Sequence, residues 1–167
     1  FSLPVKRGDK GKKVKLVQEW LCLNGISLNI DKSFGPATER ALKKFQINNG
    51  LIENGIADQQ VIETLAKPML NALFDIPSTK PVFNDLVLAY AEQHCRQNSR
   101  EIGNANCGPW VRLYMDGNEG SQWYWCAGFV TFIYTQTSQT YNLTMPIKRT
   151  FSCDNLAFQP RNNGTFL

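Results

Sequence analysis

One cysteine of the chain stands in a setting that suits nucleophilic chemistry. Cys126 belongs to the strongly apolar string Trp-Cys-Ala-Gly-Phe-Val at residues 125–130, which predicts a helix that begins close to the thiol. At a helix N-terminus, unsatisfied backbone N–H groups and the helix dipole stabilise a thiolate and can receive an oxyanion during acyl transfer. The alternative is a cysteine buried in the core without reactivity.

A thiol nucleophile needs a base to take its proton and later to protonate the leaving amine. The chain has a single histidine, His94, and no histidine follows Cys126. His94 lies in a segment that predicts a helix over about residues 85–97. The residues expected to turn inward are Leu86, Ala89, Tyr90 and Cys95. We therefore expect His94 to be a half-exposed helix residue and not the catalytic base.

The chain has four further cysteines, which are Cys22, Cys95, Cys107 and Cys153. The odd total leaves at least one thiol unpaired within the monomer, and a Cys95–Cys107 disulfide is conceivable in an oxidising compartment. The neighbours of Cys153, Ser152 and Asp154, suit a helix cap, which predicts a structural role for this cysteine. No pair has the close spacing of a zinc knuckle, so we predict neither a metal site nor a cofactor.

The N-terminal part of the chain has the pattern of three short helices. Apolar residues recur with a period near 3.6 over about residues 12–24, which predicts the first helix. Pro36 opens the second, and the pair at 49–50, Asn-Gly, ends it. Asp58 is a plausible N-cap for the third, and we expect Pro68 to end that helix.

The turns ahead of the second and third helices resemble each other. Residues 31–35 and 54–58 each begin with an Asx residue that opens a tight turn, continue with an apolar residue and lead into a helix. Neither turn-helix unit can bury its apolar face alone. We expect the two to pack on one another and on the first helix.

Residues 8–66 resemble the three-helix peptidoglycan-binding domain of bacterial and phage wall hydrolases. The resemblance rests on the combined spacing of Gly8, Asp9, Gly11, Val14, Gln18, Leu21, Gly25, Asp31, Phe34, Gly35, Thr38, Ala41, Phe45, Gln46, Gly50, Leu51, Gly55 and Ile56. Lys32 replaces a glycine that is common in the family, and Asn54 replaces an aspartate. The resemblance implies a peptidoglycan-binding domain over residues 1–67.

Two glutamines of this domain have two interpretations. Each amide, at Gln18 and at Gln46, either ties a loop to a helix or helps to line a shallow groove for glycan or stem peptide. Neutral hydrogen-bonding side chains suit such a sugar-peptide ligand. The predicted substrate-binding residues of this groove are Gln18, Asp31, Thr38, Arg40 and Gln46.

Prolines and polar residues over 68–84 predict a linker, and a second domain follows over residues 85–167. The second domain resembles the CHAP amidohydrolase/peptidase family, which contains papain-like cysteine hydrolases of cell walls. The resemblance rests on Glu101, Asn106, Gly108, Pro109, Val111, Tyr114, the string at 125–130 and the Ser-Cys-Asp at 152–154. It implies that Cys126 is the nucleophile, and we expect Glu101 and Asn106 to help hold the substrate.

The departure from this second family concerns the base. The family supplies a histidine on a β-strand after the nucleophile helix, and this chain ends at Leu167 near the point where that sheet would start. We therefore expect a mainly α fold, made of a three-helix domain and the helical half of a papain-like α+β domain. The parent protein is then a cysteine amidase or endopeptidase, and this chain by itself is inactive. The alternative is a non-catalytic wall-binding or structural protein with a degenerate hydrolase domain.

Composition is that of an ordinary globular protein, with 43% hydrophobic and 19% charged residues among 167, and no run long enough to span a membrane. A basic cluster over residues 6–15 either attracts an anionic polymer or forms a solvated helix face. It lacks interleaved aromatic residues, so we expect peptidoglycan and not nucleic acid as the partner. The resemblances imply a secreted, wall-associated or phage-borne protein, and no signal peptide is visible.

Overall fold

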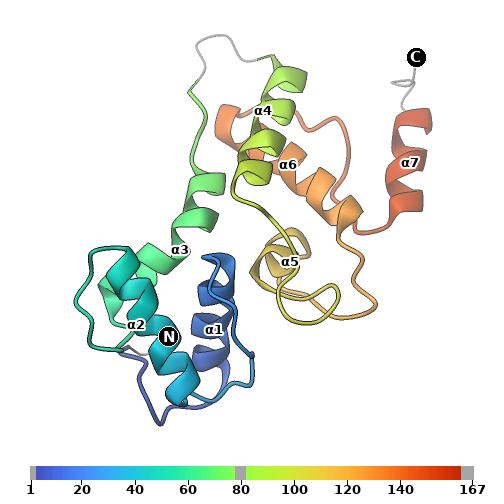
Figure 1. Cartoon of the computed structure of the whole chain (residues 1–167). Coiled ribbons are helices and arrows are strands. Elements are labelled where there is room, and N and C mark those ends of the chain that lie inside the picture. Colours follow the sequence, from blue (N-terminus) through green and yellow to red (C-terminus); the bar gives the residue numbers. More distant parts are fainter. Residues whose placement is uncertain (1–2, 78–81, 163–167) are drawn as a thin grey trace. The chain divides into compact units, whose positions relative to one another are not determined.

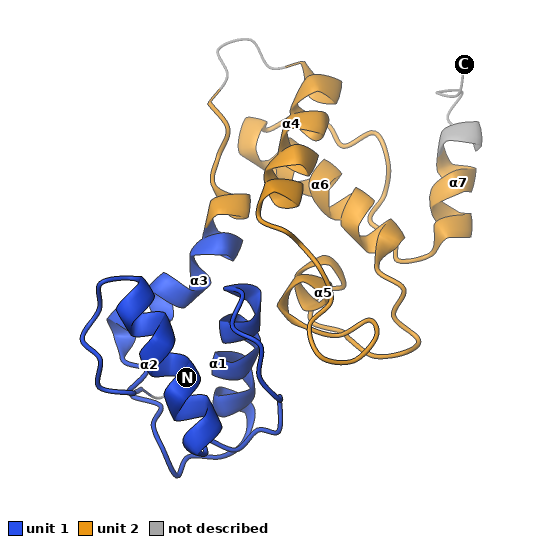
Figure 2. Cartoon of the chain, viewed as in Figure 1, with its two compact units in different colours: residues 1–70 blue, residues 71–167 orange. Residues whose placement is uncertain are grey.

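The computed structural model describes residues 3–77 and 82–162 of the chain. Over these residues the backbone forms seven α-helices, and its only β pairing consists of isolated bridges (Figure 1). The predicted mainly helical fold is therefore confirmed. The chain divides into two compact units, residues 1–70 and residues 71–167 (Figure 2). No helix within the described ranges is both long and apolar enough to cross a bilayer.

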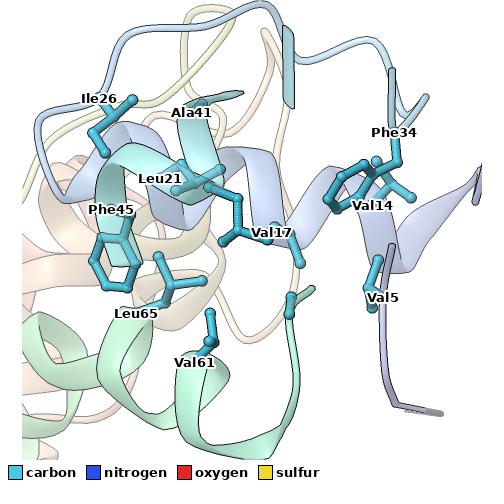
Figure 3. Close-up of a cluster of buried hydrophobic side chains, with 12 residues drawn as sticks. Val5, Val14, Val17, Leu21, Ile26, Phe34, Ala41, Phe45, Val61 and Leu65 are labelled. Carbon is cyan, nitrogen blue, oxygen red and sulfur yellow. The ribbon is translucent and has the colours of Figure 1, made fainter. Parts of the chain in front are cut away.

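Unit 1 is built from α1 (Lys12–Leu23), α2 (Pro36–Asn48) and most of α3 (Gln59–Leu73). Apolar residues three or four positions apart form the inward stripe of each helix, because 3.6 residues complete one turn. Their side chains meet in one core between the helices (Figure 3). The core residues are Val5, Val14, Val17, Leu21, Ile26, Phe34, Ala41, Leu42, Phe45, Ala57, Val61 and Leu65.

The third helix does not end at Pro68, as the sequence pattern predicted. Pro68 lies inside α3, which continues to Leu73. A proline inside a helix removes one hydrogen bond and costs about 3 kcal/mol. The predicted linker over 68–84 is therefore wrong at both ends, where residues 68–73 and residues 83–84 are helical. Its residues 78–81 lie outside the described ranges.

Tertiary contacts stabilise the helical turn that follows this proline. Ala72 is fully buried, and its carbonyl oxygen accepts hydrogen bonds from Gln93 Nε2 at 3.0 Å and Gln136 Nε2 at 3.1 Å. Ala72 and both glutamines belong to unit 2. These long-range contacts offset the cost of Pro68 inside the helix. Sequence spacing does not show them, which is why the local pattern predicted a helix end at this proline.

Unit 2 contains α4 (Phe83–Arg96), α5 (Pro109–Tyr114), α6 (Cys126–Tyr141) and α7 (Cys153–Asn162). Helices α4 and α6 pack on each other, and α5 and α7 contact α6. Helix α6 passes very close to the end of α5 at Gly128. A Cβ atom at this glycine would lie 2.3 Å from Met115 Sδ and 2.7 Å from the Tyr114 carbonyl oxygen. Glycine is therefore required for this packing.

A single arginine ties the segment before α7 to the body of unit 2. Arg149 Nη1 donates to the carbonyl of Gly128 at 2.6 Å and to Thr131 Oγ1 at 2.8 Å. Its Nη2 donates to the carbonyl of Tyr114 at 2.5 Å and pairs with Asp116 Oδ1 at 2.8 Å. Such a planar fork of donors fixes direction as well as distance. Arg149 thus anchors the chain that leads into α7.

Candidate functional site

Gln18 on α1 fastens the turn that precedes α2. Its Nε2 donates to Asp31 Oδ1 at 2.8 Å and to Thr38 Oγ1 at 3.0 Å, and its Oε1 accepts the Lys32 N–H at 3.0 Å. Asp31 Oδ1 also accepts the Ser33 N–H at 2.9 Å. The hydrogen bond from Gln18 lowers the pKa of Asp31, so this carboxylate stays ionised near neutral pH.

Gln46 on α2 repeats this arrangement for the turn that precedes α3. Its Nε2 donates to Asn54 Oδ1 at 2.9 Å, and its Oε1 accepts the backbone N–H of Gly55 at 2.9 Å. Asn54 Oδ1 in turn accepts the Ile56 N–H at 2.9 Å. Lys32 (φ 63°) and Gly55 (φ 69°) occupy the same left-handed position in the two turns. The internal repeat predicted from the sequence is therefore confirmed in three dimensions.

The two glutamines and Thr38 are buried, whereas Asp31 and Arg40 are exposed. The amides of Gln18 and Gln46 already bond to groups of the chain, which favours the loop-tying interpretation for both. Of the five predicted groove residues, the structure brings Gln18, Asp31 and Thr38 into direct contact, whereas Gln46 lies on α2 and bonds to the other turn.

Ion pairs reduce the net positive charge of the basic cluster over residues 6–15. Lys13 Nζ lies 3.0 Å from Asp9 Oδ2, and Lys15 Nζ lies 3.3 Å from Glu19 Oε1. Part of the positive charge over residues 6–15 is thus neutralised within the helix and its entry turn. This favours a solvated helix face over an anion-binding surface.

Cys126 is the first residue of α6, and its side chain is exposed. The structure therefore excludes the buried-core alternative for this cysteine. Its Sγ lies 3.2 Å from Cys153 Sγ, at the first residue of α7. Ser152 Oγ accepts the Asn155 N–H at 3.2 Å, so the helix cap predicted beside Cys153 is confirmed. All five cysteines are thiols in the structure, Cys95 and Cys107 included.

The Cys126 thiol borders a pocket of about 450 Å³ within unit 2. Aromatic and aliphatic side chains form most of its wall, and Asn106 and Ser99 contribute polar groups. The complete lining is Cys95, Ser99, Asn106, Tyr124, Trp125, Cys126, Phe129 and Val130. A pocket of this size beside an exposed thiol can hold part of a small peptide-like ligand.

Of the predicted residues Glu101 and Asn106, Asn106 lines the same pocket as Cys126, and Glu101 bonds to another pocket residue, Trp125. Glu101 Oε1 accepts a hydrogen bond at 2.9 Å from Nε1 of Trp125, the residue that directly precedes Cys126. Asn106 has a left-handed backbone (φ 52°), and its carbonyl accepts the Gly120 N–H at 2.7 Å. The fold thus gathers the three residues that the sequence assigned to unit 2. Within the described ranges, no three His, Cys, Asp or Glu side chains gather as metal ligands.

His94 is fully buried, so the prediction of a half-exposed residue was wrong. It continues the inward stripe of α4 that includes Leu86 and Tyr90, since the three residues are four positions apart. Cys95, which the pattern placed inward, is exposed. Burial of an imidazole requires hydrogen-bond partners, and these come from other helices.

The partners of His94 determine its protonation. Gln136 Nε2 donates to the carbonyl of Ala72, which turns Gln136 Oε1 toward His94 Nε2 at 2.9 Å. An amide oxygen only accepts, so Nε2 carries the proton and Nδ1 accepts from the Tyr114 hydroxyl at 2.9 Å. Burial raises the pKa of Tyr114 and lowers the pKa of His94, which keeps both rings neutral. Both nitrogens of His94 are thus occupied inside the core.

Sequence reasoning missed Gln136 and the contact between the two thiols. Gln136 follows Phe129, Phe132 and Ile133 at spacings of seven, four and three residues. A polar residue in an apolar helix stripe is the signal that could have found it. No local signal brings Cys126 and Cys153 together, because they are 27 positions apart.

Comparison with known families identifies the N-terminal part of the chain. Residues 10–65 match a family model described as "Putative peptidoglycan binding domain". Unit 1 carries a domain of this family. The peptidoglycan-binding domain covers α1, α2 and the first half of α3, together with both glutamine-fastened turns. Comparison with curated proteins gave no match.

Three solved structures are similar to parts of the chain. A peptidoglycan-binding protein from Clostridioides difficile, in complex with glutamine hydroxamate, is 36% identical over 38% of this chain and 40% of its own (TM-score 0.37). The SleB N-terminal domain is 35% identical over 40% of this chain and 94% of its own (TM-score 0.39). A Burkholderia AP3 phage endolysin is 26% identical over 60% of this chain and 39% of its own (TM-score 0.39). The chain therefore spans less than half of the first and third proteins.

Proposed function

We propose that this protein acts on bacterial peptidoglycan, with unit 1 as the wall-binding module and unit 2 as part of a cysteine hydrolase of the CHAP type. The match of residues 10–65 to peptidoglycan-binding domains carries the proposal. The exposed thiol of Cys126 beside a pocket supports the catalytic half. A wall-bound module raises the concentration of substrate near a tethered second domain.

Unit 1 contacts the wall through exposed groups around the fastened turns. Asp31 and Arg40 are the exposed members of the predicted groove, and they offer an acceptor and a set of donors to glycan hydroxyls or stem-peptide amides. Gln18 and Gln46 do not contact the ligand; their amides hold the turns in place, and Thr38 accepts a hydrogen bond from Gln18. In this scheme, the buried amides shape the surface and the exposed charges contact the ligand.

In unit 2, Cys126 Sγ attacks the carbonyl carbon of an amide in the stem peptide or at the muramoyl-alanine link. A thioester forms, the amine leaves with a proton, and water then releases the acid. Backbone N–H groups in the first turn of α6 receive the oxyanion. Glu101 and Asn106 hold the substrate. The thiol proton must pass to a general base and then to the leaving amine, and His94 cannot serve as that base because both of its nitrogens are bonded inside the core.

The second candidate is a wall-binding or structural protein whose hydrolase domain is degenerate. The environment of His94 favours this candidate. Both imidazole nitrogens are already hydrogen-bonded, to Tyr114 and to Gln136, so His94 cannot act as the base. No other histidine exists in the chain. Under either candidate we expect this chain by itself to bind wall without cleaving it.

Sedimentation with purified sacculi tests the binding half. The chain should pellet with sacculi, and Arg40→Ala should weaken binding several-fold. Lys44→Ala removes the same charge from an exposed position of α2 and serves as the matched control. A chain that stays in the supernatant, or equal losses for both variants, would refute the proposed surface.

Release of free amines or acids from sacculi tests the catalytic half. In a longer protein that contains this chain and releases such groups, Cys126→Ala should abolish release and leave sedimentation unchanged. Retained release would exclude Cys126 as the nucleophile. Absence of release from the chain and from any longer protein that contains it would favour the degenerate-domain alternative.

A further inference from the structure

Two exposed thiols face each other at the starts of two helices. Cys126 and Cys153 are the first residues of α6 and α7, and their sulfurs are 3.2 Å apart. A disulfide bond is about 2.05 Å long, so the sulfurs need to approach by only ~1.2 Å. The neighbouring backbone is held in place by Arg149, four positions before Cys153, which bonds to the carbonyl of Gly128 on α6.

We propose that Cys126 and Cys153 form a redox-active dithiol, a site that a low-molecular-weight disulfide such as glutathione disulfide oxidises to an intramolecular disulfide. The Cys126 thiolate attacks one glutathione sulfur, which forms a mixed disulfide and releases one glutathione thiolate. The Cys153 thiolate then attacks Cys126 Sγ and releases the second. The two protons lost by the cysteines pass to the two glutathione thiolates, so the cysteines are oxidised and the glutathione disulfide is reduced.

Local chemistry supports this order of attack. A hydrogen bond with Cys126 raises the pKa of Cys153, so Cys153 keeps its proton to a higher pH than an isolated thiol does. Its deprotonation therefore belongs to the second step, when the attacking thiol must release its proton. The closing step accelerates as the pH rises, because only a thiolate attacks a disulfide.

Formation of this disulfide would block the site described above, a consequence that rests on the proposed function. The sulfur that attacks the wall amide would be bonded to Cys153 and could not act until a reductant released it. The dithiol itself rests on geometry and does not depend on whether Cys126 is a catalytic nucleophile. Its test accordingly reads covalent structure and not wall cleavage.

The experiment exposes the whole folded chain to mixtures of reduced and oxidised glutathione, followed by alkylation, trypsin digestion and mass spectrometry. Trypsin cuts after Lys148 and Arg149, so the two cysteines lie on separate peptides that only a disulfide links. We expect the Cys126–Cys153 peptide pair as the main oxidised product, with a loss of two hydrogen atoms per chain. A dithiol reductant should reverse it.

Matched variants identify the roles of the thiols. Cys153→Ser should instead accumulate glutathione on Cys126, and Cys95→Ser should leave the linked pair unchanged although Cys95 lines the same pocket. Both positions are exposed, which spares the core. Three results would overturn the proposal: a stable glutathione adduct on Cys126 in the unaltered chain, a Cys126–Cys95 link, or the same mixture of links in folded chain and in guanidinium.

Discussion

Removal of the Gln46 amide tests whether the buried glutamines of unit 1 fasten its turns. Gln46→Met keeps the length of the side chain and deletes both amide groups. The change removes the hydrogen bonds to Asn54 Oδ1 and the Ile56 carbonyl, and it leaves the N–H groups of Asn54 and Gly55 without their acceptor. Gly55 is buried, so water cannot easily replace the lost acceptor.

The size of the effect follows from these contacts. A lost hydrogen bond costs about 0.5–1.5 kcal/mol, and a buried donor left unpaired costs about 1–3 kcal/mol. We expect Gln46→Met to lower the free energy of unfolding of unit 1 by about 3 kcal/mol. Gln18→Met should cost less, about 2 kcal/mol, because the Lys32 N–H that it abandons belongs to an exposed residue. A 70-residue unit has about 4–10 kcal/mol in total, so the loss is large.

Two measurements detect the change in stability. Denaturant unfolding of the full chain gives its size, and amide hydrogen exchange, resolved to peptides of each unit, shows in which unit it occurs. Exchange in unit 1 should accelerate and unit 2 should be unaffected. Gln60→Met alters an exposed glutamine of α3 and should stay within about 0.5 kcal/mol of the unaltered chain. Unchanged stability of Gln46→Met together with lost sacculus binding would refute the fastening role and favour direct ligand contact.

Three further predictions concern unit 2. His94 has a lowered pKa in the folded chain, so the unfolded chain binds more protons below about pH 6.5. As the pH decreases below this value, the free energy of unfolding should decrease by up to ~1.4 kcal/mol per pH unit until the folded pKa is passed. The pH dependence of unfolding, with His94→Gln as control, measures this change. Gly128→Ala should cost about 1–3 kcal/mol in thermal unfolding, because its Cβ would overlap the Tyr114 carbonyl. Oxidation of Cys126 and Cys153 closes a loop of about 28 residues and should raise stability in denaturant by about 3–4 kcal/mol; an unshifted midpoint would contradict the chain-entropy estimate.

Local sequence patterns predicted most of the helices and their ends. The 3.6-residue period predicted α1, and Pro36 marks the start of α2. Asp58 caps α3 through the Val61 N–H at 3.0 Å, as expected of an Asp ahead of a helix. These features depend on residues within one or two turns of each other, which is why sequence alone determines them.

Other features depended on partners far along the chain. Pro68 lies inside a helix because the turn after it is held by Gln93 and Gln136, and His94 is buried because Tyr114 and Gln136 satisfy its nitrogens. A proline inside a helix and a buried imidazole are each tolerated only when distant groups supply hydrogen bonds, and sequence spacing does not reveal those groups.

The sequence by itself determined the helical class, the wall-binding resemblance, the repeated turns and the candidate thiol. Only the tertiary structure placed Cys126 on an exposed helix start beside a pocket and set Cys153 against it. Helix periodicity fixes which face of each helix is apolar, but it does not fix which residues of two helices meet. That depends on how their surfaces pack, and here close packing at Gly128 and the hydrogen bonds of Arg149 decide it.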